Sequence, residues 1–157
     1  MKMTDAEAAA VAFMTASRAL LGMSLRSVAA APVPLTVPQH RLLVLVSADG
    51  PRRIGTLAAD LGVNQSNASR LVARLVDQGL VRRVTDPADG RASVVEATAE
   101  GRRVLDAVSE HRLRELRAVV AAMPVESWAP AVEVLHAFNA AAHEAEAVPA
   151  GTDGEGR

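Results

Sequence analysis

The sequence has no cysteine and almost no aromatic residues. Its 157 residues include two Phe, one Trp and no Tyr. A chain without cysteine has no disulfide, thiolate zinc site, iron–sulfur cluster or cysteine-based redox sensor. Strands depend on aromatic and β-branched side chains, so the scarcity of aromatics favours a mainly helical fold.

Long uncharged apolar runs are also missing. No stretch of 18 uncharged apolar residues occurs, and Asp5 and Glu7 precede the first apolar segment. This pattern predicts neither a membrane span nor a signal peptide, so we expect a cytoplasmic protein. Hydrophobic residues make up 50% of the chain and charged residues 22%, which is typical of one globular domain at this length.

The net charge of −1 is unevenly distributed along the chain. Residues 52–91 carry seven Arg and four Asp, whereas residues 100–157 carry six Arg and ten acidic residues. The basic middle suits an anionic partner, and the acidic remainder keeps the chain soluble. Segments with this much positive charge also occur in proteins that never bind DNA, so charge alone does not decide the function.

Apolar periodicity predicts a long first helix over residues 5–30. Arg18 occupies a position in the apolar seam of this helix where an apolar side chain is expected. A narrow seam on a long helix is more often buried against a partner than against its own chain. The seam consists of Val11, Met14, Leu21, Leu25 and Val28.

Three further helices are predicted next, over residues 36–48, 54–61 and 64–78. The last of them has one apolar side and one polar side, and amide, hydroxyl and guanidinium groups suit base edges in the DNA major groove. This arrangement is a helix-turn-helix; the alternative is an ordinary solvated helix face. The apolar side comprises Ala68, Leu71, Val72, Leu75 and Val76, and the polar side comprises Gln65, Ser66, Ser69, Arg70, Ala73 and Arg74.

A β-hairpin is predicted after the helix-turn-helix. Two β-branched runs, 80–85 and 92–97, are joined by the turn-rich segment 86–91. A hairpin in this place is a wing, and Arg91 at its tip suits a narrow DNA minor groove. We expect Asp89 to hold the Arg91 guanidinium in position; the alternative is a surface ion pair of little energetic value.

These motifs resemble, in order and spacing, those of the MarR family of winged-helix transcription regulators. The resemblance covers about residues 5–147 and is strongest over 36–105. It rests on Leu35-Thr36-x-x-Gln39, Arg70-Leu71-Val72-x-Arg74-Leu75-x-x-x-Gly79-Leu80-Val81-x-Arg83, Asp86-Pro87-x-Asp89-Gly90-Arg91 and Thr98-x-x-Gly101. The implied fold is mainly α with a small β-hairpin wing: a winged helix-turn-helix domain plus long N- and C-terminal dimerisation helices.

The resemblance also implies a function. Members of this family act as homodimers on double-stranded DNA at palindromic operators, usually as repressors that small anionic or phenolic ligands release. The residues that match the family's DNA-binding positions are Gln65, Ser66, Asn67, Ser69, Arg70, Arg74, Asp89 and Arg91.

Four regions are expected along the chain. Residues 1–34 form an N-terminal dimerisation helix and connector, and residues 35–97 form the winged helix-turn-helix DNA-binding region. Residues 98–147 form C-terminal dimerisation helices, and residues 148–157 are expected to be a disordered tail.

A pocket for a small aromatic or phenolic effector is expected between the DNA-binding lobe and the dimer helices. The candidate ligand-binding residues there are Arg18, His40 and His111. Arg18 is the preferred anchor, because a buried Arg is costly unless an anion neutralises it. The alternatives are that Arg18 pairs with an acid of the partner subunit or extends to solvent.

The sequence contains no motif of a known catalytic site. We therefore expect no enzyme activity, no metal and no cofactor. The main hypothesis is a ligand-responsive dimeric repressor. The alternative is an architectural DNA-binding protein with little sequence preference and no ligand, whose affinity would be uniform across sequences and steeply dependent on salt.

Overall fold

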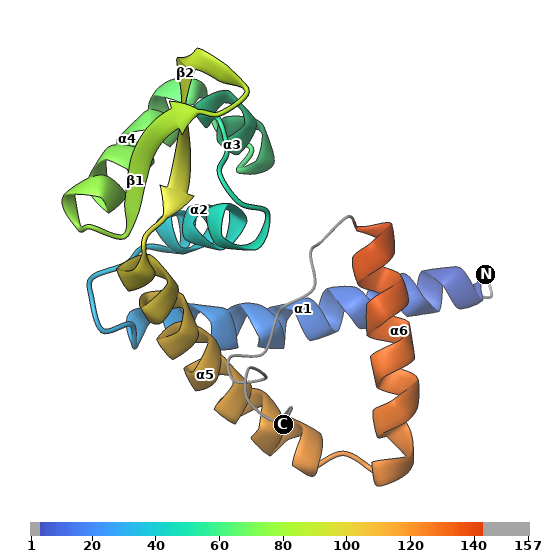
Figure 1. The fold of residues 1–157 in the computed structure, drawn as a ribbon. Coiled ribbons are helices and arrows are strands. Elements are labelled where there is room, and N and C mark those ends of the chain that lie inside the picture. The colour runs from blue at the N-terminus through green and yellow to red at the C-terminus, as the bar shows by residue number, and fades with distance from the viewer. Residues whose placement is uncertain (1–3, 143–157) are drawn as a thin grey trace, which may run out of the picture.

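A computed structural model describes residues 4–142, and within that range the chain forms six α-helices and one β-hairpin (Figure 1). This confirms the mainly helical fold with a hairpin wing. The expected tail at 148–157 lies outside the described residues. In chain order the elements are α1 (Asp5–Ala29), α2 (Val37–Ala48), α3 (Ile54–Asp60), α4 (Gln65–Asp77), β1 (Val81–Asp86), β2 (Asp89–Ala97), α5 (Ala99–Ala121), the 3₁₀ turn η1 (Val125–Ser127) and α6 (Trp128–Ala141).

Local capping chemistry sets where α2 begins. Thr36 Oγ1 accepts a hydrogen bond from the Gln39 backbone N–H at 3.4 Å, and Gln39 Oε1 accepts one from the Thr36 N–H at 2.8 Å. This reciprocal pair satisfies two N–H groups that the first helical turn leaves open. The same arrangement, with Thr4 and Glu7, begins α1.

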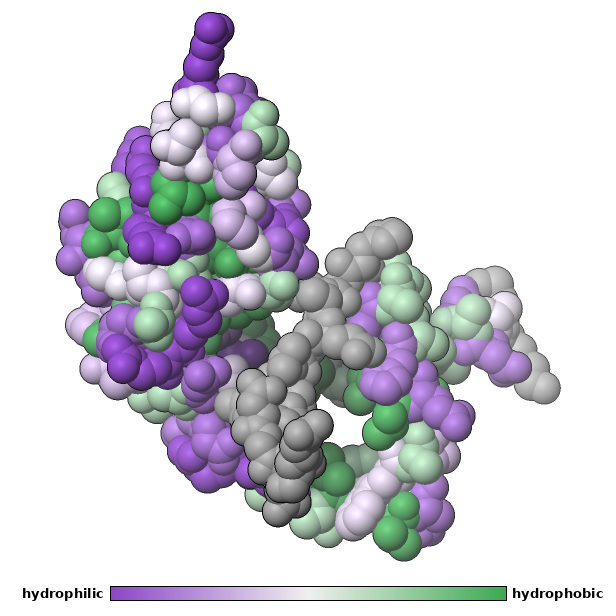
Figure 2. All heavy atoms as spheres, in the orientation of Figure 1, coloured by the Kyte–Doolittle hydropathy of each residue, from purple (hydrophilic) through white to green (hydrophobic). Residues whose placement is uncertain are grey.

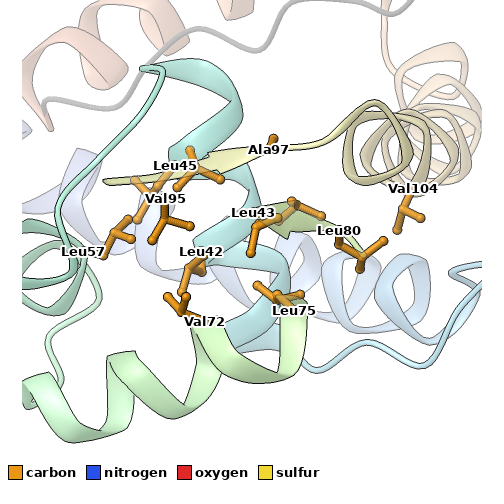
Figure 3. Packing of buried hydrophobic residues seen from close by; sticks show 12 residues of the cluster. Leu42, Leu43, Leu45, Leu57, Val72, Leu75, Leu80, Val95, Ala97 and Val104 are labelled. Carbon is orange, nitrogen blue, oxygen red and sulfur yellow. The ribbon is translucent and has the colours of Figure 1, made fainter. Parts of the chain in front are cut away.

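A single apolar core joins α2, α3, α4, the hairpin and the start of α5 into one lobe (Figure 3). Each fully buried aliphatic side chain contributes about 1.5–3 kcal/mol relative to an exposed one, so this cluster supplies most of the stabilisation of the lobe. The cluster consists of Leu42, Leu43, Leu45, Val46, Leu57, Val72, Leu75, Leu80, Val81, Val95, Ala97 and Val104.

The first turn of α5 is fixed to the end of α4 by Thr98. Its hydroxyl donates to the Gly79 carbonyl at 2.6 Å, and its backbone N–H donates to the Leu80 carbonyl at 3.0 Å. Gly101 lies one turn into α5 and is buried directly against Leu80 and Leu43. The helix therefore leaves the lobe from a tightly packed base.

Helices α1 and α5 extend away from the lobe, and α6 turns back from the far end of α5 and crosses α1 (Figure 1). The Arg26 guanidinium binds the Glu115 carboxylate through Nε at 3.1 Å and Nη2 at 2.7 Å, which ties α1 to α5. Near the far end of α1, the rings of Phe13 and Phe138 stack at 4.5 Å. These contacts hold α1, α5 and α6 together as an open frame.

Most apolar side chains of this frame are not covered by the chain itself. Of the predicted α1 seam, Val28 is buried, while the other members are 46–57% exposed. By length and composition alone, α1 could also cross a membrane, since an 18-residue window has a mean hydropathy of 1.4 and is only 6% buried. Figure 2 shows further hydrophobic side chains on the visible face of α6. The exposed members of the seam are Val11, Met14, Leu21 and Leu25.

Candidate nucleic-acid interface

Helix α4 presents a polar face to solvent along its length. The Asn64 side chain begins the helix by accepting a hydrogen bond from the Asn67 N–H at 2.8 Å. Arg70 and Arg74 are exposed, and neither side chain makes a hydrogen bond or ion pair within the described part of the chain. Their guanidinium groups are therefore available to an external partner. Gln65, Ser66 and Asn67 are also exposed, whereas Ser69 is half-buried.

The opposite side of α4 carries most of the expected buried residues. Ala68, Val72 and Leu75 are fully buried, and Leu71 is partly so. Val76, which is also predicted on this side, is 38% exposed. At about 100° per residue, Val76 lies at the edge of the arc centred on the three buried residues.

The wing is a two-stranded antiparallel hairpin in which Val81 pairs with Ala97 and Thr85 with Ser93. Asp89 and Arg91 are both exposed near the turn. Asp89 Oδ1 accepts a hydrogen bond from the Arg91 backbone N–H at 3.2 Å, and no ion pair joins their side chains among residues 4–142. An Asp side chain readily bonds the backbone two residues on, so the expected Asp89 contact to the Arg91 guanidinium is replaced by a contact to its backbone.

A second contact at the wing was not anticipated from the sequence. The Arg53 guanidinium donates to Asp86 Oδ2 through Nε at 2.8 Å and Nη2 at 2.6 Å. Asp86 Oδ1 accepts a hydrogen bond from the Ala88 backbone N–H at 2.9 Å. That N–H and the Arg53 guanidinium lower the pKa of the Asp86 carboxyl below its ordinary value. Asp86 is thus an ionised, buried anchor between the turn and the start of α3.

The recognition elements gather at one end of the lobe. Helices α3 and α4 and the hairpin lie together in Figure 1, and hydrophilic side chains cover the wing end in Figure 2. Arg53, Gln65 and Ser93 line a hollow of about 510 Å³ between the start of α3, the start of α4 and the wing. A surface of this composition suits a phosphate-rich groove rather than a small apolar ligand.

Away from this end, the structure brings a histidine and a cation together between α1, α2 and α5. His40 is buried, and its pKa is lowered to about 4 by burial and by the charges of Arg112 and Arg41. Arg112 donates to Ser27 Oγ at 3.1 Å through both Nε and Nη2, and burial lowers its pKa. Within the described residues Arg112 has no carboxylate partner. Sequence reasoning missed Arg112, whose burial depends on how α5 packs on α1.

The other two ligand candidates lie elsewhere. Arg18 is exposed on α1 and has no hydrogen bond or ion pair within residues 4–142. His111 Nε2 lies 3.5 Å from Glu115 Oε1, beside the Arg26–Glu115 pair. Arg18, His40 and His111 therefore do not converge on one described site, and the convergent pair is His40 with Arg112.

Comparison with known proteins gives the family. A profile of the MarR family matches residues 33–92. The crystal structure of RV1404 from Mycobacterium tuberculosis is 35% identical, with a TM-score of 0.82 over 94% of this chain and 100% of that one. This chain belongs to the MarR family. The family consists of transcriptional regulators, not enzymes, and its members bind DNA, typically as dimers.

Other transcriptional regulators are also similar to this chain. The transcriptional regulator HosA of Escherichia coli O111:H- is 34% identical over 74 residues, which are 46% of this chain and 54% of HosA. The chain thus spans about half the length of the curated relatives it matches. PcaV of Streptomyces coelicolor, solved in complex with its natural ligand, shares the fold at 24% identity and a TM-score of 0.52, over 90% of this chain and 99% of that one.

Proposed function

We propose that this chain is a cytoplasmic, sequence-specific repressor that binds a palindromic operator as a homodimer and is released by a small anionic or aromatic ligand. The observation that carries the DNA-binding part is the unpaired polar face of α4 beside the wing. Arg70 and Arg74 lie one turn apart on this face, and their side chains make no hydrogen bond within the described residues. Free guanidinium groups on a helix that fits the major groove recognise guanine in two-pronged contacts.

Dimerisation is supported by the uncovered apolar surface of α1 and α6. Leu21 is 57% exposed and Leu135 is 47% exposed, although both belong to helices already held in place by the Phe13–Phe138 stack. A soluble protein rarely leaves so many large apolar side chains in water unless another protein covers them. A second copy of the same chain covers them with matching surfaces, and it places two DNA-binding lobes at the spacing of a palindrome.

Ligand response is supported by the half-buried Arg112. A buried cation without a carboxylate partner is costly, and a neutral hydroxyl such as that of Ser27 compensates it weakly. A ligand carboxylate would bind the guanidinium in a two-pronged geometry, and His40 lies close enough for the charge of Arg112 to lower its pKa. The ligand-bound structure of PcaV supports ligand control in a relative with this fold.

The operator can be identified by selecting bound duplexes from a randomised pool and then measured in gel shifts at fixed salt. We expect Arg70→Ala or Arg74→Ala to weaken binding by about 1–3 kcal/mol and to relax the sequence preference at one base pair of each half-site. Arg103→Ala is the matched control, because Arg103 is an exposed arginine of α5 that pairs with Glu100. Selection that enriches no sequence would contradict specific recognition and favour the architectural alternative.

The ligand part is tested separately with aromatic carboxylates such as salicylate. Arg112→Gln should still bind the operator but should no longer be released by the carboxylate. Arg114→Gln is the control, since Arg114 lies on the same helix with its side chain 59% exposed. Release of the Arg112 variant at the same ligand concentration as the unaltered protein would refute the assignment of this site.

A further inference from the structure

Besides the core packing of its strands, the wing is bound by two neighbouring residues that precede α3, Arg52 and Arg53. The Arg52 backbone pairs with Val95 of β2, through an N–H to carbonyl hydrogen bond of 2.9 Å in one direction and 2.8 Å in the other. This bridge fixes the middle of the hairpin. Arg53, the next residue, reaches the turn itself through its side chain.

We propose that Arg53 and Asp86 form a latch that fixes the wing turn against the start of α3 and thereby holds Arg91 in the position from which it contacts DNA. The latch rests on the proposed function, because it gives the wing a defined place on the operator. Arg53 is in this sense a positioning residue for a contact that Arg91 makes.

The identity of residue 53 argues for this role. Arg53 occupies the N-cap position of α3, and its side chain makes no capping hydrogen bond. Ser, Thr, Asp or Asn in this position would satisfy an open backbone N–H and stabilise the helix by about 1 kcal/mol. The chain gives up that local stabilisation and directs the guanidinium to the wing instead.

The environment of Asp86 shows why this contact matters to the turn. The Asp86 side chain is only 11% exposed, and the strand register shifts between Thr85 and Asp86. Ladder hydrogen bonds therefore do not by themselves determine the path of the chain beyond this point. The two-pronged contact from Arg53 keeps the carboxylate ionised and in place, while its other oxygen holds the Ala88 N–H.

The latch extends towards Arg91 through Asp89. The Arg53 Nη2 atom lies 3.5 Å from Asp89 Oδ2, while Asp89 Oδ1 binds the Arg91 backbone N–H. Both acids that shape the turn thus face the same guanidinium. Removing that guanidinium leaves two neighbouring carboxylates without their cation, so the turn should separate from α3 and Arg91 should lose its fixed position.

Hydrogen exchange of the wing amides tests the latch without DNA. In full-length Arg53→Gln, the backbone amides of residues 86 and 88–91 should exchange on the order of tenfold faster than in the unaltered protein, with those of α4 unchanged. Arg53→Lys should recover part of the protection, because one ammonium replaces a two-pronged contact. The matched control is Arg82→Gln, which removes an exposed arginine that pairs with Glu96 on the same hairpin.

A double-mutant cycle on operator affinity tests the consequence for Arg91. Arg91→Ala should weaken operator binding in the unaltered protein and in Arg82→Gln. In Arg53→Gln, the fold loss of affinity caused by Arg91→Ala should be at least about three times smaller. An equal loss from Arg91→Ala in all three backgrounds, or unchanged exchange in Arg53→Gln, would overturn the latch. If Arg91→Ala has no effect in the unaltered protein, the wing contact of the proposed function is wrong, and the exchange experiment still decides whether Arg53 holds the turn.

Discussion

Replacing Gly101 by Ala should destabilise the protein, although the same change stabilises most helices. Gly101 lies within α5, where Ala is preferred over Gly by about 1 kcal/mol. A Cβ atom at Gly101 would nevertheless overlap the Leu80 carbonyl oxygen, lie 3.0 Å from the Leu80 carbonyl carbon and lie 3.1 Å from Leu43 Cδ1. The nearest obstacle is backbone, which cannot rotate aside.

The magnitude follows from how far α5 must move. Relieving the overlap requires α5 to retreat by roughly 1 Å, which forfeits a quarter to a half of the dispersion energy across the Leu43 and Val104 contacts. The retreat also stretches the 3.0 Å hydrogen bond from the Thr98 N–H to the Leu80 carbonyl, at about 1 kcal/mol. Overpacking, including the lost contacts, costs about 1–3 kcal/mol; with the stretched hydrogen bond added and the helical preference of Ala subtracted, the net loss is about 1–3 kcal/mol.

Urea unfolding followed by circular dichroism at one fixed protein concentration measures this loss. Gly55→Ala is the matched control, because Gly55 is also helical and a Cβ there meets no atom within 4 Å. That variant should be as stable as the unaltered protein or more stable by up to about 1 kcal/mol. A Gly101→Ala protein whose unfolding midpoint equals that of Gly55→Ala would refute the close approach of α5 to Leu80.

Two further predictions concern the buried His40 and the exposed Leu21. His40 has a pKa of about 4 in the folded chain and an ordinary value of 6.5. Between these values the unfolded state binds more protons, so folding stability should fall as pH drops from 6.5 to 4, by about 3 kcal/mol in total. His40→Gln should flatten this dependence in urea titrations, and parallel curves for the two proteins would show that His40 is not the cause. Leu21→Glu should yield monomers in analytical ultracentrifugation and lose operator binding. Ala16→Glu, on the opposite side of α1, is the control and should remain dimeric. A dimeric Leu21→Glu protein would place the interface elsewhere.

The parts of the fold that depend on neighbouring residues could be predicted from the sequence. The Thr36–Gln39 cap spans four residues, and the stops at Gly62 and Gly79 use positive φ angles of 64° and 71° that glycine adopts freely. Helix, turn and hairpin signals of this kind are complete within a short window. For that reason the helix-turn-helix and the wing could be predicted from the sequence.

Contacts between distant segments could not be predicted in the same way. Arg53 and Asp86 are 33 residues apart, and nothing near either residue in the sequence indicates that they form a pair. Arg112 looks like one of several arginines on α5, and only the packing of α1 against α5 buries it beside Ser27. Arg18 interrupts an apolar seam in the sequence, yet most of that seam is uncovered in the single chain. Burial, which gives a charge its chemical role, is a property of the tertiary fold.

The continuity of α5 has a mechanical consequence. The helix runs without a break from Gly101, packed in the lobe, past Arg112 to Ala121. At 1.5 Å per residue, Gly101 and Arg112 are roughly 16 Å apart along one stiff rod. A tilt of about 5° about the Arg112 level moves the lobe end of the rod by roughly 1.4 Å. Because the helix is stiff, each tilt of α5 corresponds to one position of the lobe. A ligand that favours one of two tilts by about 1.4 kcal/mol therefore shifts the ratio of the two lobe positions tenfold.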